Sequence, residues 1–449
     1  MAGTPALVQR AVVVGGGIGG LATGLALLRR GVDVRVVERA REFRAGVGAG
    51  FGLSPHGYAC LASFGLRAGT DLIGHRLEHH RLWNARFDAE LVSAAHSDHF
   101  QRLFARFGVG LYGTLRSELV GLLSAPLEKE GRLEYGREVV SVRAGKCGGE
   151  PAVVELRDGG RYEADLVVGA DGVHSKVLQL IFPEGYEASP VESQENIFYG
   201  VIPGGVGHGG ARAAGRPELF QAHTLLQNYG VFGEFVSFPA GNHGDLVWAQ
   251  VYRAASGSRE GADSGTDEWS IGGDPATRLR DFIASRGVPA AHPLREVAAL
   301  TPTGRLMHFP LIRRAHQKLW HRGRIVLLGD SAHATLPHAG QGANQALEDA
   351  VVLADCLCPA PDDAAAAAGG LEQALARYQQ RRHARTKRVV DAASGLASLA
   401  LNESALRAAG TDALLWFLIR SGLFMKLAVK EIIEECPVPL KVIDHSAKF

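Results

Sequence analysis

A buried strand that runs directly into a glycine-rich turn constrains the fold of this chain more than any other feature. The apolar run from Ala11 to Val14 is typical of a strand covered on both faces. A helix pattern follows from Ile18 to Arg30 and ends at Gly31. A second apolar run, Val34 to Val37, closes on Glu38. We therefore predict one βαβ unit at the amino terminus.

The turn carries the spacing G-x-G-x-x-G at Gly15, Gly17 and Gly20. The first glycine permits a tight turn, the second lets backbone approach a pyrophosphate, and the third lets helix pack on strand. The helix amino terminus would face the phosphate charge. Glu38 stands near the ~20-residue offset at which a carboxylate meets a ribose hydroxyl. This pattern predicts dinucleotide binding, and the alternative is a tight glycine turn without a ligand.

A second junction of strand and loop indicates which dinucleotide is bound. The apolar run from Ile325 to Leu328 stops before Asp330, which can reach a sugar or ribityl hydroxyl. Pro337 stiffens the loop that follows, and its glycines let backbone pass close to a flat ring. Asn344 stands near the start of the next helix, whose N–H groups could bind the pyrimidine end of a flavin. These features favour FAD over NAD.

Composition sets the broad class of the protein. The 449 residues suggest two or three domains, and 46% hydrophobic with 21% charged residues is typical of a soluble globular protein. Lys and Arg total 48 against 47 Asp and Glu, so the net charge of +1 gives no electrostatic argument for binding nucleic acid. Five cysteines form no even disulfide framework, and the amino terminus has no secretory pattern. We expect reduced thiols and a cytoplasmic protein, monomer or homodimer.

The apolar stretch 413–419 is too short for a membrane span, which needs about 20 apolar residues. We expect it to be a helix that packs on the body of the protein, with weak peripheral membrane contact as the alternative.

The order of these patterns predicts an α/β protein whose Rossmann-like FAD-binding domain is interrupted by a mostly antiparallel β-sheet substrate domain and followed by C-terminal helices. The FAD-binding domain is predicted in three segments, at 9–74, 108–190 and 301–358. The substrate domain would comprise a first segment at 75–107 and the substrate-binding sheet at 191–300, and a linker at 359–370 would precede helices at 371–449. We predict a hairpin of Val153–Arg157 with Tyr162–Val168, and single strands for NIFYGVIP, YGVFGEFVSF and DLVWAQVYR.

Three motifs in order resemble a known family. GGGIGGLATGLALLRRG with Glu38, DLVVGADGVHS at 165–175 and GRIVLLGDSAHATLPHAGQGANQALEDA at 323–350 are similar to the FAD-dependent aromatic hydroxylases. This group-A flavoprotein monooxygenase family includes para-hydroxybenzoate and salicylate hydroxylases and zeaxanthin epoxidases. The resemblance covers most of residues 9–390, and Glu348-Asp349-Ala350 is closer to the salicylate hydroxylase and epoxidase branch.

The resemblance implies a set of cofactor contacts. The ADP half of FAD would lie on the glycine turn and Glu38, the ribityl chain on Asp330, and the flavin ring on residues 337–344 beside 48–50. Arg116 and the Asp171-Gly172 motif would also contact FAD. The full predicted set is Gly15, Gly17, Ile18, Gly19, Gly20, Glu38, Arg39, Gly48, Ala49, Gly50, Arg116, Asp171, Gly172, Gly329, Asp330, Pro337, Gly340, Gln341, Gly342, Ala343 and Asn344.

The resemblance also implies the chemistry. NAD(P)H would reduce the flavin and leave, and O2 would then give a flavin C4a-hydroperoxide that hydroxylates or epoxidises a small, largely apolar aromatic or isoprenoid-like substrate. No side chain is assigned as acid or base, and His333, His338 and Pro337 are the only candidates. The alternatives are another FAD oxidoreductase (dehydrogenase, reductase or halogenase) or a non-catalytic FAD-binding redox protein. Leu178 stands where the middle motif usually has arginine, which favours the second alternative.

Three further groups of residues have open interpretations. The candidates for the substrate pocket include Tyr199, Phe232, Phe235 and Trp248, each of which could equally belong to ordinary sheet core. His223 and Tyr229 are the candidates for a polar handle in that pocket. His75 to His79 match a zinc-protease spacing that requires a helix, but the stretch reads as extended, so we expect no metal. The basic run at Arg381, Arg382, Arg385, Lys387 and Arg388 is interpreted as a solvated helix face.

Overall fold

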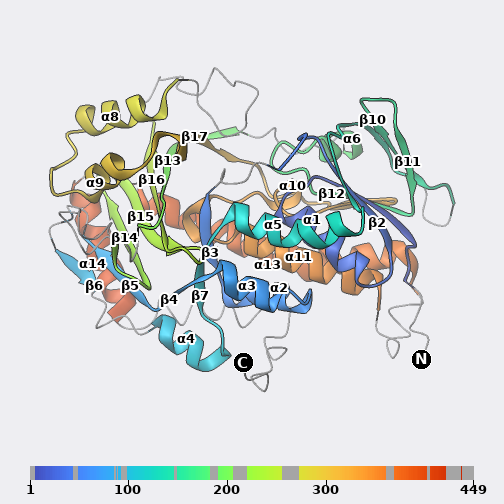
Figure 1. Cartoon of the computed structure of the whole chain (residues 1–449), viewed down its shortest axis with the longest axis horizontal. Coiled ribbons are helices and arrows are strands. Elements are labelled where there is room, and N and C mark those ends of the chain that lie inside the picture. The colour runs from blue at the N-terminus through green and yellow to red at the C-terminus, as the bar shows by residue number, and fades with distance from the viewer. Residues whose placement is uncertain are drawn as a thin grey trace.

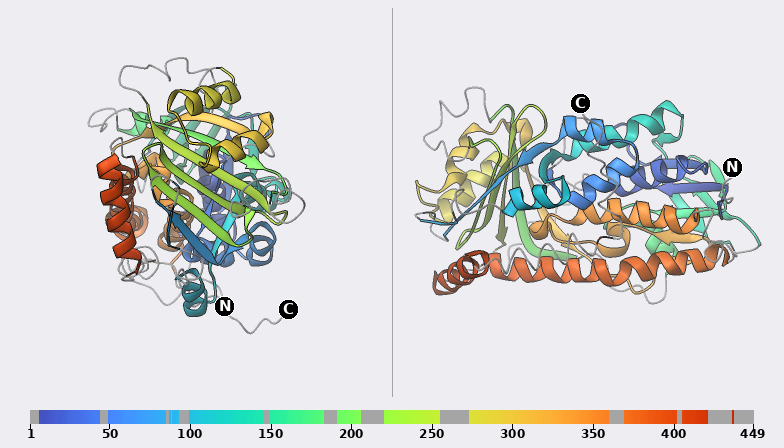
Figure 2. Two further views of the ribbon diagram at one scale, coloured as in Figure 1. Left: turned by 90° about the vertical axis from the view of Figure 1, so that its left-hand side faces the viewer. Right: turned by 90° about the horizontal axis from the view of Figure 1, so that it is seen from below.

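The computed structural model describes residues 6–43, 49–84, 87, 89–92, 99–145, 149–182, 191–205, 220–254, 273–359, 369–401, 405–420 and 436. A mostly parallel sheet with its helices occupies one side of the molecule, and a larger twisted sheet occupies the other (Figure 1). The long helix α13 runs beneath both halves (Figure 2). The mixed α/β class predicted from the sequence is confirmed.

The parallel sheet has six strands in the order β18-β19-β12-β1-β2-β8, and only β18 is antiparallel to its neighbour. Its apolar strands are buried because helices cover the sheet; α1 packs against α5 and α11, and α13 packs on α11. The strands are β1 (Arg10–Val14), β2 (Asp33–Glu38), β8 (Leu133–Tyr135), β12 (Leu166–Gly169), β18 (His321–Arg322) and β19 (Ile325–Leu327). The helices are α1 (Ile18–Leu28), α5 (Arg116–Lys129), α11 (Gly342–Leu357) and α13 (Gly370–Ala400).

A three-stranded antiparallel sheet of β9 (Val139–Arg143), β10 (Ala152–Leu156) and β11 (Arg161–Ala164) lies beside β12 and α6 (Lys176–Ile181). The hairpin of β10 and β11 was predicted. The prediction was wrong to continue its second strand to Val168, because the chain leaves this sheet after Ala164 and enters the parallel sheet as β12. The continuous apolar pattern did not mark the change of sheet.

The larger sheet has seven strands in the order β17-β13-β16-β15-β14-β5-β6. All of its pairings are antiparallel except that of β14 with β5. The strands are β5 (His79–Trp83), β6 (Glu90–Val92), β13 (Val191–Ile202), β14 (Thr224–Gly230), β15 (Gly233–Ala240), β16 (Asp245–Arg253) and β17 (Leu306–Arg313). Two details differ from the sequence prediction. YGVFGEFVSF is a hairpin with its turn at 231–232, and β17 extends the sheet beyond the predicted boundary at residue 300.

Alternate residues of the seven-stranded sheet face two different surroundings. We call the side that carries Tyr199, Tyr229 and Val247 the inner face, because it packs against Leu336 and against Ala397 of α13. We call the side that carries Phe198 and Trp248 the outer face, which is covered by α8 (Pro275–Ser285) and α9 (Pro293–Leu300). The inner face is therefore directed toward the parallel-sheet half of the molecule.

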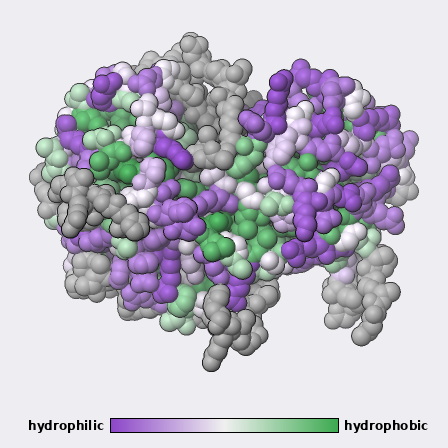
Figure 3. Space-filling view, in the orientation of Figure 1, coloured by the Kyte–Doolittle hydropathy of each residue, from purple (hydrophilic) through white to green (hydrophobic). Residues whose placement is uncertain are grey.

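A small sheet of β3 (Gly50–Leu53), β7 (Leu111–Leu115) and β4 (His75–Leu77) connects the two halves, with β7 against β15. Helices α2 (Pro55–Ser63), α3 (Arg67–Ile73) and α4 (His99–Phe107) accompany it. The stretch from His75 to His79 is extended, as predicted, with β4 at its start and β5 beginning at its end. The face shown in Figure 3 is mostly polar, and its apolar side chains gather near the middle.

The C-terminal region is helical where the structure describes it. After α13, helix α14 (Ala405–Arg420) packs on β14 and β6 through the buried Leu415. The packing expected for the apolar stretch 413–419 does not extend to Leu414, Trp416 and Phe417, which are 43%, 44% and 58% exposed. The linker predicted at 359–370 lies mostly outside the described residues. Within the described stretches of the chain, no helix is long and apolar enough to cross a membrane. Cys60, Cys356 and Cys358 are free thiols, and Cys147 lies outside the described residues.

Candidate cofactor and substrate site

Three neighbouring strands of the parallel sheet end at the same edge. Val14 of β1 is paired with Gly169 of β12, and Gly169 is paired with Leu327 of β19. The loops that follow these strands begin at Gly15, Ala170 and Leu328, so three segments far apart in sequence meet there. Ligands of open α/β sheets bind at this carboxyl edge. The residues predicted for the cofactor therefore converge on one place.

The glycines of the first turn have different roles. Gly15 has a φ of 110°, and a Cβ on Gly20 would overlap the carbonyl oxygen of Gly15, so both positions require glycine for the fold itself. Gly19 is close to Leu328, whose Cδ2 would be 2.7 Å from an added Cβ. Gly17 differs, because no protein atom lies within 4 Å of the point that a Cβ would occupy. The open side of Gly17 leaves room for a ligand.

The amino terminus of α1 has no side-chain cap among the described residues. Gly17 is its N-cap residue, supplies no side-chain hydrogen bond, and is followed by a first turn without an acidic residue. The first N–H groups of a helix have no intrahelical acceptor and carry partial positive charge. Ile18, at the start of this helix, is partly exposed. This arrangement suits a negatively charged group such as pyrophosphate.

Glu38 is held beside the same turn by two backbone hydrogen bonds. Its Oε2 accepts from Gly16 N at 2.6 Å and its Oε1 accepts from Ala40 N at 2.8 Å. Each carboxylate oxygen retains further acceptor capacity, which a ribose hydroxyl could use. Arg39, the next residue, is exposed.

The middle motif has a structural role that the sequence does not indicate. The carboxylate of Asp171 accepts hydrogen bonds from Ser175 Oγ at 2.5 Å and from the backbone N–H groups of Lys176 and Val177 at 2.7 and 3.1 Å. It thereby fixes the start of α6. Gly172 N donates to Ser331 Oγ at 3.1 Å, which joins this motif to the loop after β19. Sequence reasoning missed this role of Ser331.

Leu178 lies in α6 and is fully buried in the core of the parallel-sheet half. Its side chain packs among the other apolar residues of that core.

Asp330 and Pro337 are two exposed residues in a segment whose other residues are mostly buried. From Ile325 to Ala334 every residue is buried except Asp330, and Pro337 is exposed between the buried Leu336 and His338. Asp330 begins the short helix α10 (Asp330–His333) after Gly329, which has a φ of 61°. Arg116 interacts electrostatically with Asp330, and its backbone N–H donates to Ala49 O at 2.8 Å. Asp330 and Arg116 therefore lie in the same region.

A buried network of charged side chains holds the turn at Gly329 and Asp330. Asp349 Oδ2 accepts from Gly329 N at 3.0 Å and lies 2.6 Å from His333 Nε2. Arg382 of α13 donates through Nε to Asp349 Oδ1 at 2.6 Å and also pairs with Glu348. Arg385 donates to Glu348 at 2.7 Å.

The basic run of α13 therefore differs from the sequence prediction. Arg381, Lys387 and Arg388 are exposed as expected, but Arg382 and Arg385 are 0% and 4% exposed. The prediction of a solvated face was wrong for these two residues, because their partners Glu348 and Asp349 lie on the buried side of α11.

The loop at residues 334–341, which we call the Pro337 loop, ends at α11. Gly340 has a φ of 60° and no protein atom within 4 Å of the point that a Cβ would occupy, and Gly342 begins the helix. Asn344 uses its own side chain to bind Gly52 O at 2.9 Å and Ser54 N at 3.1 Å. What this helix start offers a ligand is therefore its backbone N–H groups, at Gly342, Ala343 and Asn344.

Strand β3 joins this region to the seven-stranded sheet. Gly50 N donates to the hydroxyl of Tyr199, which lies on the inner face. Burial raises the pKa of the Tyr199 phenol above its ordinary value, although the hydrogen bond with Gly50 opposes the change. Ala49 is described and partly exposed, whereas Gly48 lies outside the described residues.

The six candidates for the substrate pocket do not lie together. Tyr199 and Tyr229 are on the inner face. Phe235 and Trp248 are in the core of the outer face, and Phe232 packs against that core. His223 is exposed at the edge of β14, with Nδ1 2.8 Å from Arg76 O. The side chains of a β-strand alternate between its two faces, so the sequence predicts which residues share a face. It does not predict which of the two faces meets the cofactor loops.

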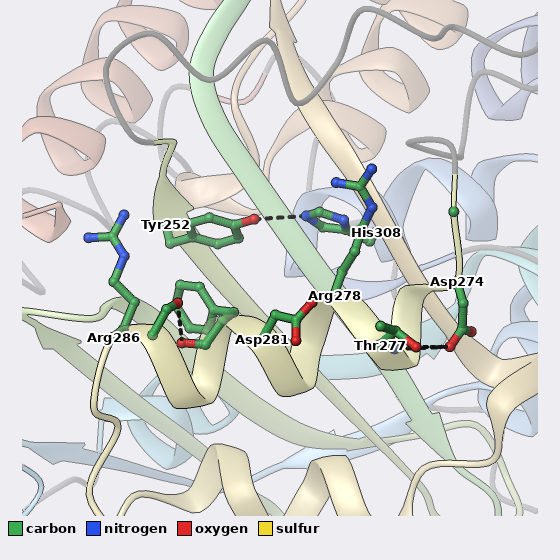
Figure 4. Close-up of a pocket in the computed structure, with 10 residues that line it drawn as sticks. Tyr252, Asp274, Thr277, Arg278, Asp281, Arg286 and His308 are labelled. Atoms are coloured by element: carbon green, nitrogen blue, oxygen red, sulfur yellow. Dashed lines mark hydrogen bonds between the residues drawn. The ribbon is translucent and has the colours of Figure 1, made fainter.

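A cavity of about 530 Å³ lies on the outer face, between α8, β16 and β17 (Figure 4). Tyr252 and His308 line it, with Nε2 of His308 2.9 Å from the tyrosine hydroxyl. Desolvation lowers the pKa of His308 to about 3, so the ring is neutral. The seven-stranded sheet separates this cavity from the loops around Asp330 and from the inner face.

The residues at the edge of the parallel sheet fit FAD. Gly17 leaves open space at a helix start without a side-chain cap, and Glu38 and Asp330 offer carboxylates. The sequence matches the family described as "FAD binding domain" over residues 9–191 and 290–393, more than half of the chain. The chain belongs to this family of FAD-dependent monooxygenases.

Curated relatives and solved structures agree with the family. A 3-amino-4-hydroxybenzoate 2-monooxygenase of Streptomyces cremeus is 31% identical over 383 residues, which cover 85% of this chain and 84% of the relative. A 6-methylsalicylate 1-monooxygenase of Aspergillus terreus is 28% identical over 84% of this chain and 80% of its own length. The structure of HpxO of Klebsiella pneumoniae with FAD and uric acid has a TM-score of 0.76 at 20% identity, covering 96% of this chain and 98% of that one.

This family member is an FAD-dependent oxidoreductase, a monooxygenase of aromatic substrates. The likeness to HpxO concerns the fold alone, whereas the family match and the similarity to named monooxygenases concern the activity. The recognition made on the three sequence motifs is confirmed.

Proposed function

We propose that this protein uses NAD(P)H and O2 to hydroxylate a small aromatic ring that carries a hydroxyl group. The observation that supports this most is the junction of the two halves of the molecule. The Pro337 loop and Gly50, which would hold the ring end of FAD, both contact the inner face of the seven-stranded sheet. A substrate between them would lie beside the cofactor and against a mostly apolar surface.

Each segment of the site has a defined task in this proposal. Gly17 and the start of α1 would bind the pyrophosphate, Glu38 the ribose, and Asp330 the ribityl chain. When bound, FAD supplies the redox chemistry, transferring electrons from a nicotinamide donor to O2 so that one oxygen atom enters the ring. Apolar side chains of the inner face, including Val247 and Phe238, would exclude water and orient the substrate.

The substrate class follows from the relatives and from the inner face. The relatives named above act on a 3-amino-4-hydroxybenzoate and on 6-methylsalicylate. A ring hydroxyl makes an aromatic ring electron-rich, which oxygen transfer requires. Tyr199 and Tyr229 bring phenol groups to the inner face, where they could hydrogen-bond such a ring. We therefore favour hydroxylation of a phenol over epoxidation of an isoprenoid chain.

The nicotinamide donor would bind only transiently. The glycine fingerprint that joins β1 to α1 lies in the turn assigned to FAD, so it would not serve the nicotinamide donor. The buried Leu178 offers no charge for a nicotinamide nucleotide, so contacts to the donor would come from other residues. NADH and NADPH are both included in the test.

The proposal is tested by titrating the FAD-loaded protein with NADPH or NADH in the absence of oxygen while following the visible absorption of FAD. The titrations include 3-amino-4-hydroxybenzoate or 6-methylsalicylate, with benzoate as the control that lacks a ring hydroxyl. We expect bleaching that a phenolic compound accelerates and benzoate does not, and a product that contains one atom from ¹⁸O2. Bleaching without any labelled product for every phenol would contradict hydroxylation, and absence of bleaching with both donors would contradict the use of NAD(P)H.

A further inference from the structure

A buried histidine connects the Pro337 loop to the seven-stranded sheet. His338 lies in the 3-10 helix η4 (Pro337–Ala339), and its side chain is 0% exposed. Its Nδ1 is 2.5 Å from Glu234 Oε2, and its Nε2 is 3.3 Å from Glu195 Oε2. Both ring nitrogens therefore meet carboxylates that come from a different region of the molecule.

The two glutamates lie on β13 and β15, the strands on either side of β16, and both face the same side of the sheet. Glu234 of β15 is paired with Val251 of β16, and Glu195 of β13 is paired with Arg253, two residues further along β16. Opposite residues of antiparallel strands, and residues two apart on one strand, share a face. Val251 belongs to the inner-face cluster, so Glu195 and Glu234 both point from the inner face toward the loop.

The geometry favours a protonated imidazole. A neutral histidine has one N–H donor, so one of the two carboxylates would face an unprotonated ring nitrogen. Burial by itself would lower the pKa of His338, but hydrogen bonds to Glu195 and Glu234 and their negative charges raise it to about 9. The ring is therefore positively charged at neutral pH, and both of its N–H groups donate.

Among the titratable groups around this cluster, His338 is the main one that we expect to lose a proton between pH 7 and 10. Gln227 of β14 donates to Glu234 Oε1 at 2.9 Å and lies 3.2 Å from His80 Nε2 of β5. Burial lowers the pKa of His80 to about 4, and burial with the charge of Glu234 raises the pKa of Tyr229 well above its ordinary value. On α13, which also packs against η4, Lys387 and Asp391 pair with each other on the exposed side.

We propose that Glu195 and Glu234 are positioning residues that hold His338 as an imidazolium and so fix the Pro337 loop against the inner face. The proposal rests on the function proposed above, because it assigns the Pro337 loop to the ring end of FAD. His338 neighbours Pro337 directly, so its two ion pairs set the distance between this loop and the surface that would carry the substrate. Loss of either pair moves the loop and changes the surroundings of the bound ring.

The test compares wild type with Glu234→Gln, Glu195→Gln and His338→Gln, and with His243→Gln as the matched control in an exposed turn. The first measurement is the thermal unfolding temperature of the FAD-free protein between pH 6 and 10. A histidine whose pKa is raised by folding stabilises the protein below its unfolded pKa, and this stabilisation is lost as pH rises through about 9. We expect a transition near pH 9 in wild type and in His243→Gln, and none in His338→Gln.

Removal of one carboxylate gives the decisive result. Since an opposite charge in contact shifts a pKa by about 1 to 3 units, the transition in Glu234→Gln should move to lower pH by that amount. Glu195→Gln, which removes the longer contact, should move it less and is the variant to use if Glu234→Gln does not fold. If Glu234→Gln or Glu195→Gln folds and its transition stays at the pH of wild type, the proposed ion pairs of His338 would be refuted.

The second measurement is the visible absorption spectrum of the FAD-loaded proteins over the same pH range. We expect the bands to shift with the same midpoint in wild type and His243→Gln, and to lie at the high-pH position throughout in His338→Gln. Spectra that are identical in all variants at all pH values would overturn the positioning role, even where the unfolding data support the ion pairs. If the protein does not bind FAD, the proposed function fails, whereas the unfolding data still test the cluster.

Discussion

Arg382 and Asp349 form an ion pair in which neither side chain is exposed, with the guanidinium Nε 2.6 Å from the carboxylate Oδ1. The same carboxylate accepts a hydrogen bond from Gly329 N at 3.0 Å. A side chain of α13 is thereby connected to the turn that presents Asp330. The pair stabilises the cofactor site without lining it.

Substitution Arg382→Met should therefore destabilise the protein strongly. It would leave the buried carboxylates of Glu348 and Asp349 short of positive charge, and breaking a buried pair in this way costs about 3–5 kcal/mol. Arg388→Met on the same helix is the control and should cost no more than about 0.5 kcal/mol, because Arg388 is exposed. Urea unfolding measures both, and equal midpoints would refute a stabilising role of the pair.

The same network predicts loss of stability in acid. Burial by itself would raise the pKa of Glu348, but Arg382 and its other charged neighbours lower it from 4.5 to about 2. A carboxyl group whose pKa is lowered on folding stabilises the protein above its unfolded pKa, and the stabilisation is lost as pH falls through the folded pKa. The unfolding temperature should thus fall between pH 4.5 and 2.

In Glu348→Gln this fall should be shallower, whatever the stability of the variant at pH 7. Glu130→Gln, in an exposed position, should keep the slope of wild type. Parallel curves for Glu348→Gln and wild type would show that Glu348 does not cause the acid sensitivity.

Two glycines of the first turn should respond differently to the same substitution. Gly20→Val would push a side chain into the carbonyl oxygen of Gly15, and overpacking of this kind costs about 1–3 kcal/mol. At Gly17 the point that a Cβ would occupy has no described atom within 4 Å outside the adjacent residues, so Gly17→Val should lower the unfolding temperature of the FAD-free protein much less than Gly20→Val. The side chain of Gly17→Val would fill the space proposed for pyrophosphate, and FAD affinity should fall at least about tenfold, or about 1.4 kcal/mol. Fluorescence titration with FAD checks this, and unchanged affinity would place the pyrophosphate elsewhere.

The arginine that usually ends the middle motif cannot simply be restored. Leu178→Arg would bury a charge in the apolar core of the parallel-sheet half, so we expect a loss of several kcal/mol and little folded protein. Leu180→Arg on the same helix should be tolerated, since Leu180 is 40% exposed. Circular dichroism during thermal unfolding compares them. A stable Leu178→Arg protein would mean that α6 can turn this position outward.

The sequence predicts those features of the fold that depend on local patterns. The run from Ala11 to Glu38 forms the predicted βαβ unit because its apolar strands, glycine turn and helix end are encoded in adjacent residues. The convergence of Gly15, Asp171 and Asp330 follows from the rule that parallel strands end at a common edge.

Features that depend on distant partners could not be read in the same way. Arg382 looks like any arginine on a polar helix, and only the position of Asp349 on α11 shows that it is buried. Trp248 and Tyr199 belong to equally apolar strands, yet they face opposite sides of the sheet because the packing of α8 and α13 decides which side is outer. Glu195 and Glu234 carry no motif, and they become informative only when His338 is placed between them.

The dependence of the Asp330 turn on Arg382 has a consequence for synthesis of the chain. A ribosome releases the glycine turn of residues 15–20 first, but the guanidinium that neutralises Glu348 and Asp349 emerges more than 30 residues after them. Until α13 has docked, two uncompensated carboxylates stand behind the turn, which opposes closure of the site. The nascent protein should therefore capture its flavin late, and fragments that end before residue 382 should fail to retain it.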